Sequence, residues 1–176
     1  PKYLNSPDTP VFNKGRNLFA LNIAKKTRQG RIILTEGYMD TISLHQAGFD
    51  CAVASLGTAL TSDHAQLLSR YTKEIIIAYD GDGAGVSAAQ RAIPILEKTG
   101  MSVKVLRVHG AKDPDEFLKK YGPTAFAKLL DQSENHIEYR IEQVQHKYNL
   151  EDDAQRLEFL KEAVSIVAGL SSPIER

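Results

Sequence analysis

The clearest structural signal in this chain is the segment EIIIAYDGDGAG, residues 74–85. Its first six residues form a short, almost entirely apolar run, which is typical of a parallel strand buried on both faces. The glycine-rich turn that follows carries Asp80 and Asp82 and leads into a predicted helix over about residues 86–99. A buried strand, a tight turn and a helix are the beginning of a βαβ unit.

The same alternation of strand and helix occurs on both sides of this segment. Short apolar runs predict further strands at 31–35, 51–55 and 101–108. Helices are predicted between them, at about 39–47 and 62–71. Short strands separated by helices of about ten residues predict an α/β fold, with a mostly parallel sheet of about four strands flanked by helices.

The rest of the chain divides into an N-terminal flank and a helical end. Residues 1–16 contain three prolines and predict extended chain, followed by a helix from Asn17 to about Arg28. Helices are predicted at 114–121, 123–132, 134–148 and 152–168. We therefore expect a basic extended segment and helix at 1–30, the α/β domain at 31–115, and a small all-helical subdomain at 116–176.

Composition excludes several classes of protein. Hydrophobic residues make up 42% and charged residues 25%, which excludes a disordered or fibrous chain. A single cysteine, Cys51, excludes an internal disulfide and a cysteine-based zinc site. No apolar run is long enough to span a membrane, so we expect no membrane partner. Because the chain begins at Pro1 rather than at methionine, we expect it to be part of a longer protein.

The net charge is zero, but the charges are unevenly distributed. Residues 1–30 hold six basic side chains against one acidic side chain, Asp8. Lys2, Tyr3 and Asn5 lie close together, and Lys14 follows a second aromatic residue. Extended chain with cations and aromatic rings can follow the phosphates of a single strand and stack a base. A solvated loop has the same composition, so both interpretations stay open on composition alone.

Acidic residues fall where the predicted strands end. Because parallel strands place their carboxyl ends at one edge of a sheet, we expect these carboxylates to meet there. Two unit charges about 4 Å apart repel by about 4 kcal/mol at an effective dielectric near 20, and a divalent cation relieves that repulsion. Oxygen ligands without histidine or cysteine favour Mg²⁺ or Mn²⁺ over zinc. The acids concerned are Glu36, Asp40, Asp80, Asp82, Asp113 and Asp115.

Six segments, taken in order, closely resemble those of bacterial DnaG-type DNA primases. They are KYLNSP (2–7), FNKG (12–15), TEGYMD (35–40), ASLGTAL (54–60), YDGDGAG (79–85) and KDPDEF (112–117). The third and fifth are similar to the TOPRIM signature, which topoisomerases, some nucleases and recombination-mediator proteins share. The flanking segments KYLNSP, ASLGTAL and DPDE (113–116) point to primase rather than to these relatives. The resemblance implies a fragment of the primase catalytic core, with a TOPRIM-type sheet followed by the helical subdomain.

The resemblance also implies an activity. Such an enzyme is a nucleotidyltransferase, a DNA-directed RNA polymerase of the primosome that makes short RNA primers from ribonucleoside triphosphates on single-stranded DNA during replication. Glu36, Asp80 and Asp82 would be catalytic and, with Asp40, Asp113 and Asp115, would hold Mg²⁺, or Mn²⁺ as its substitute. Lys2, Tyr3, Asn5 and Lys14 would belong to a basic ridge that guides template and nucleotide.

Several expected features of the family would lie outside this chain. Zinc is expected only in a missing N-terminal module, and the replicative helicase is expected to bind through a missing C-terminal domain. The expected location is the cytoplasm, at the nucleoid-associated replisome, and the fragment is expected to be monomeric.

Two alternatives stay open from the residues: another TOPRIM enzyme, such as a nuclease or part of a topoisomerase, and a receiver-like phosphoacceptor module. A receiver would place an acidic pair after the first strand and a single acceptor after the central one, the reverse of the order here.

Overall fold

The computed structural model describes residues 6–169. The chain forms two compact units, Pro1–Ser133 and Glu134–Arg176, and each is described by itself. None of the helices within residues 6–169 has the length and apolar character that crossing a membrane requires.

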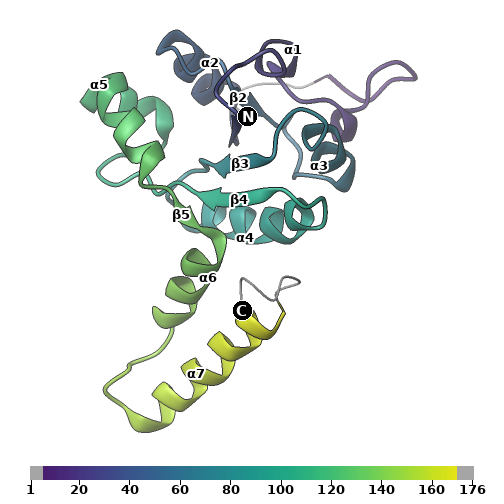
Figure 1. Ribbon diagram of the computed structural model, residues 1–176. Coiled ribbons are helices and arrows are strands. Elements are labelled where there is room, and N and C mark those ends of the chain that lie inside the picture. The colour runs from purple at the N-terminus through teal and green to yellow at the C-terminus, as the bar shows by residue number, and fades with distance from the viewer. Residues whose placement is uncertain (1–5, 170–176) are drawn as a thin grey trace. The chain divides into compact units, whose positions relative to one another are not determined.

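Four parallel strands form the centre of the first unit (Figure 1). They are β1 (Arg31–Thr35), β2 (Ala52–Ala54), β3 (Glu74–Ile77) and β4 (Ser102–Val105), in the order β2-β1-β3-β4. Leu34 of β1 lies opposite Val53 and Ile77, and Ile77 lies opposite Val105. The four strands therefore end at almost the same level, which confirms the predicted mostly parallel sheet.

Helices cover both faces of this sheet (Figure 1). The helices α2 (Tyr38–Gln46) and α5 (Pro114–Asp131) pack together over one face, and α3 (Ser62–Leu68) and α4 (Gly83–Glu97) lie over the other. The predicted break between residues 121 and 123 is confirmed, because α5 bends at Gly122, where φ is 78°. Glycine adopts this left-handed conformation without steric cost.

The apolar core beneath α2 and α5 explains where the first unit ends. Phe117, Phe126 and Leu130 of α5 belong to the same buried cluster as Ile33 and Ile76 of the sheet. Burying a side chain of this size contributes about 1.5–3 kcal/mol. The compact units consequently divide after α5, between residues 133 and 134, whereas the sequence predicts a domain boundary between 115 and 116.

The second unit is built from two main helices. A two-residue strand, β5 (Glu134–Asn135), precedes α6 (His136–Gln145) and α7 (Asp153–Ala168). The side chain of Asn135 caps α6 by accepting the N–H of Ile137 at 3.0 Å. These helices agree with the predicted segments 134–148 and 152–168, apart from the short strand and the ends.

The predicted helix from Asn17 to Arg28 is wrong at both ends, because only Leu21–Ala24 is helical. Phe19 is extended instead, because its N–H donates to the carbonyl of Ala54 at 2.8 Å and covers the edge of β2. The helix α1 (Leu21–Ala24) begins only after Ala20, whose φ of 61° is left-handed and so interrupts any helix through this position. The 3-10 turn η1 spans Lys14–Arg16.

Candidate functional site

Glu36 follows β1 directly, in a turn fixed by two buried threonines. The hydroxyl oxygens of Thr35 and Thr41 lie 2.7 Å apart, and both side chains are fully buried. This hydrogen bond joins the end of β1 to the first turn of α2. Glu36 and Asp40 therefore both lie at the carboxyl edge of the sheet.

Asp80 and Asp82 follow β3 in a turn that is tied to the loop after β4. The N–H of Gly81, between the two acids, donates to the carbonyl of Lys112 at 3.0 Å. Asp82 is the N-cap of α4. One of its oxygens therefore has a structural role, which agrees with the preference for aspartate at helix N-caps.

Gly85 lets the loops after β1 and β3 approach each other. Its N–H donates to the Asp82 carboxylate at 2.8 Å. A Cβ at this position would lie 2.1 Å from the carbonyl oxygen of Asp80 and 2.8 Å from Oε1 of Glu36. Any larger residue would therefore have to push Asp80 or Glu36 out of position.

Asp113 and Asp115 begin α5, which follows β4. Asp113 is the N-cap, and its carboxylate accepts the N–H of Glu116 at 2.8 Å. The N–H of Asp115 donates to the Asp40 carboxylate at 3.3 Å, and its own carboxylate pairs with Lys119 at 2.6 Å. The start of α5 is thus joined directly to α2.

The predicted acids come together. A cavity of about 560 Å³ is lined by Glu36, Asp40, Asp80, Asp113 and Asp115. Asp82 does not line it, but its charge contributes to raising the pKa of Glu36. Sequence patterning did not single out three further lining residues, namely Tyr38, Lys112 and Lys119. For Lys119 a signal existed, because it lies four residues after Asp115 on a predicted helix.

Burial and mutual repulsion raise the pKa of two of these carboxyls. The pKa of Glu36 is raised by burial first and then by the charge of Asp80, while a backbone hydrogen bond at Asp80 opposes the shift. The pKa of Asp40 is raised to about 6 by burial first and then by the charge of Asp113. Carboxylates from the segments that follow β1, β3 and β4 therefore interact electrostatically.

The donor set fits a hard divalent cation. Within residues 6–169, no three carboxylate, histidine or cysteine side chains are already arranged around one point as metal ligands. However, Oε1 of Glu36 is buried and accepts no hydrogen bond, which is costly for a carboxylate oxygen. Mg²⁺ binds through one or two carboxylates and retains several waters, so it does not need a preformed cage.

The predicted ridge is only partly within the described residues. Lys2, Tyr3 and Asn5 lie outside them. Lys14 lies in η1, which packs against α3.

The parallel sheet and its acidic edge define a TOPRIM domain, and the family model described as Toprim-like matches residues 33–118. The chain belongs to the bacterial DnaG-type DNA primase family. A DNA primase of Clostridium acetobutylicum is 46% identical over 177 residues, which cover 100% of this chain and 30% of that protein. The chain spans about 30% of the length of the curated relatives it matches.

Solved structures agree with this assignment. The zinc-binding and RNA polymerase domains of the Aquifex aeolicus primase are 40% identical, with a TM-score of 0.81 over 99% of this chain and 42% of that one. A DnaG primase catalytic domain bound to ssDNA is 34% identical, with a TM-score of 0.85 over 99% of this chain and 56% of that one.

A second family model corrects one expectation. The model described as the DnaB-helicase binding domain of primase matches residues 137–176, whereas the sequence interpretation placed helicase binding entirely outside this chain. The patterns at 134–148 and 152–168 indicate helices and carry no motif for a partner. Patterning alone therefore does not find this segment.

Proposed function

We propose that this chain is the metal-binding part of a primase catalytic core that joins ribonucleoside triphosphates into a short RNA primer on single-stranded DNA. The observation that carries the proposal is the cavity lined by five carboxylates from the loops and first helical turns that follow β1, β3 and β4. A cavity with this much negative charge is suited to divalent cations and, through them, to a triphosphate.

In the proposed reaction, the 3′-hydroxyl oxygen of the primer attacks the α-phosphorus of the next nucleotide. The bond from this phosphorus to the bridging oxygen breaks, and pyrophosphate leaves. Mg²⁺, when bound, would neutralise charge on the phosphate oxygens. Glu36, which directly follows β1, would take up the hydroxyl proton or orient a metal-bound group. Residues that would hold the cations are Asp80 and Asp82, together with Glu36, Asp40, Asp113 and Asp115.

The proposed partners follow from the same assignment. The single-stranded template and the nucleotide would meet the ridge formed by Lys2, Tyr3, Asn5 and Lys14. The similarity to a catalytic domain bound to ssDNA supports the template as a partner. The match of residues 137–176 to a helicase-binding domain supports a replicative helicase as another. We place the protein at the replisome of the bacterial cytoplasm.

Primer synthesis by the full-length primase tests this function. Asp80→Asn and Asp82→Asn keep the size of each side chain and remove its charge, so synthesis on single-stranded DNA with Mg²⁺ should fall at least about 100-fold. Asp153→Asn, an exposed aspartate of α7, is the matched control and should leave synthesis unchanged. Normal synthesis by the Asp80 and Asp82 variants would reject the proposal. Relaxation or cutting of supercoiled DNA by the same protein would favour another TOPRIM enzyme.

A further inference from the structure

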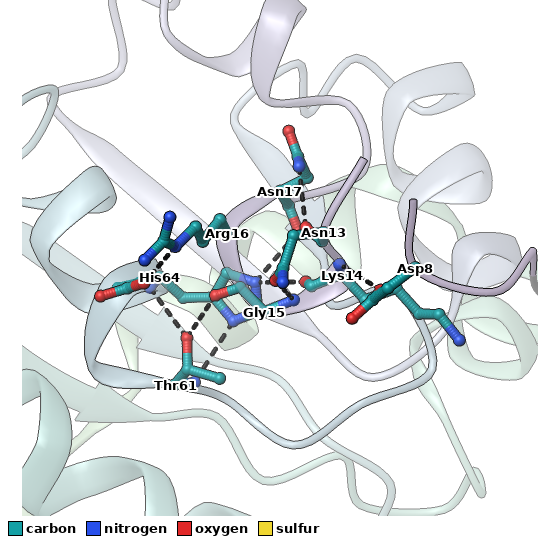
Figure 2. A network of polar contacts seen from close by, with 9 residues as sticks. Asp8, Asn13, Lys14, Gly15, Arg16, Asn17, Thr61 and His64 are labelled. Carbon is teal, nitrogen blue, oxygen red and sulfur yellow. Dashed lines mark hydrogen bonds and ion pairs between the residues drawn. The ribbon is translucent and has the colours of Figure 1, made fainter. Parts of the chain in front are cut away.

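Residues 13–17 are fastened to the beginning of α3 by a polar network that centres on His64 (Figure 2). His64 is fully buried, and its Nε2 lies 2.8 Å from the carbonyl oxygen of Lys14 and 3.0 Å from that of Asn17. Because both partners are acceptors, Nε2 carries the proton and donates it. Nδ1 accepts the N–H of Thr61 at 3.3 Å. Burial lowers the pKa of His64, which favours this neutral ring.

Two further contacts hold the same turn. The hydroxyl of Thr61 donates to the carbonyl of Gly15 at 2.6 Å. The guanidinium of Arg16 pairs with Asp63 at 2.8 Å. The turn η1 is therefore attached to α3 through its backbone carbonyls and through one ion pair.

The backbone of Lys14 is fixed at both of its polar atoms, while its side chain is left available. The N–H of Lys14 donates to the carboxylate of Asp8 at 3.0 Å, and its carbonyl accepts from His64. Among residues 6–169 the Lys14 ammonium forms no ion pair, in contrast to the charge of Arg16. Figure 2 shows the Lys14 side chain extending away from the backbone network.

We propose that His64 and Asp8 are positioning residues, which hold the backbone of Lys14 so that its ammonium meets a phosphate of single-stranded nucleic acid. The inference rests on the proposed function, in which Lys14 contacts the template. A loop that is ordered beforehand loses less conformational freedom on binding, so the contact becomes tighter without any additional group touching the ligand.

Asp8 gives the sharpest test, because positioning and simple electrostatics predict opposite signs. The measurement is fluorescence anisotropy of labelled oligothymidylate with this chain over a salt series. Loss of a negative charge beside a cation should by itself tighten binding of a polyanion. If Asp8 positions Lys14, Asp8→Ala instead weakens binding about three- to tenfold. It also lowers the slope of the logarithm of the binding constant against the logarithm of the salt concentration by about 0.7 in magnitude. Asp8→Asn retains an acceptor for the Lys14 N–H and should bind at least as tightly as the unchanged chain.

A double-mutant cycle tests His64. If His64 acts through Lys14, then His64→Leu weakens binding but causes no further loss once Lys14→Ala is present. His64→Gln, whose amide can still donate to one carbonyl, should retain part of the affinity. Thermal melting with Mg²⁺ identifies any variant that fails to fold. If His64→Leu does not fold, the comparison of Asp8→Ala with Asp8→Asn alone tests the positioning of Lys14.

The outcomes separate this inference from the proposed function. Additive losses in the cycle, or tighter binding by Asp8→Ala, would overturn the positioning role alone. Unchanged binding by Lys14→Ala would overturn both the positioning role and the assignment of Lys14 to the ridge. Neither result bears on metal-dependent synthesis at Asp80 and Asp82, which the primer assay measures separately.

Discussion

The backbone N–H of Asp115 donates to the carboxylate of Asp40 at 3.3 Å, although 75 positions separate the two residues. The bond connects the first turn of α5 to the first turn of α2, and both carboxylates line the same cavity. Asp40 is only 8% exposed, and its pKa is raised to about 6 by burial and by the charge of Asp113. The folded chain therefore carries an ionised carboxyl at neutral pH in surroundings that disfavour it.

Stability without divalent cations should fall as the pH rises from about 4 to about 6. In this range the folded state retains a proton on Asp40 that the unfolded chain, with an ordinary carboxyl pKa of 3.8, has already lost. The stabilisation from protonated Asp40 is complete below the unfolded pKa and is lost as the pH passes the folded pKa. Urea unfolding in EDTA at several pH values measures this. Asp40→Asn should make the free energy of unfolding depend less on pH in this range. An equally steep pH dependence in that variant would contradict the raised pKa of Asp40.

Mg²⁺ should stabilise the folded chain, and more strongly at pH 7.5 than at pH 5. At the lower pH the proton on Asp40 competes with the cation. Ligand at about 100 times its dissociation constant contributes about 2.7 kcal/mol, which is readily visible as a higher melting temperature. Asp82→Asn is an informative variant, because asparagine also caps helices and should leave the metal-free stability of α4 nearly unchanged. If Mg²⁺ raises the melting temperature of Asp82→Asn as much as that of the unchanged chain, Asp82 is not a ligand.

Lys119 should compete with a bound cation for Asp115. Its ammonium lies 2.6 Å from Oδ2 of Asp115, and both residues line the cavity. The Lys119 side chain is 71% exposed, so solvent screening weakens the pair and a cation can displace it. Lys119→Gln should therefore tighten Mn²⁺ binding about two- to fivefold in calorimetry. Lys120→Gln is the control, because Lys120 pairs at 2.7 Å with Glu116, which does not line the cavity. Equal effects of the two variants would indicate a general charge effect.

Sequence patterning predicted the sheet and the meeting of the acids for a simple physical reason. Parallel strands end at one edge, so residues such as Glu36 and Asp80, which directly follow strands, can be assigned a common location without coordinates. Lys119 also lines this cavity but does not follow a strand, so the strand-end argument does not place it there. It lies on α5, which packs against α2, and such packing depends on side-chain shapes far apart in the sequence.

The N-terminal flank shows the limit of local signals. Asn17 is a good helix cap by residue type, yet its side chain donates to the carbonyl of Asn13 at 2.8 Å. The pairing of Phe19 with Ala54 extends the chain where helix was predicted. A long-range contact thus overrides a weak local preference. The role of His64 has the same origin, since its two carbonyl partners come from the flank and not from its own helix.

Two glycines of one turn should respond in opposite directions to the same substitution. Gly85→Ala places a methyl group 2.1 Å from the Asp80 carbonyl oxygen, so the backbone must move. The free energy of unfolding should therefore fall by about 1–3 kcal/mol or more. Gly83 lies in the same helix, but a methyl group at this position would have no neighbouring atom within 4 Å. Gly83→Ala should therefore raise the free energy of unfolding by up to about 1 kcal/mol. Chemical denaturation measures both changes.

Because the new methyl group at position 85 also lies 2.8 Å from Oε1 of Glu36, the stabilisation by Mg²⁺ should decrease in Gly85→Ala and persist in Gly83→Ala. A full Mg²⁺ response in Gly85→Ala would show that the acidic edge does not require the close approach of Glu36 and Asp80.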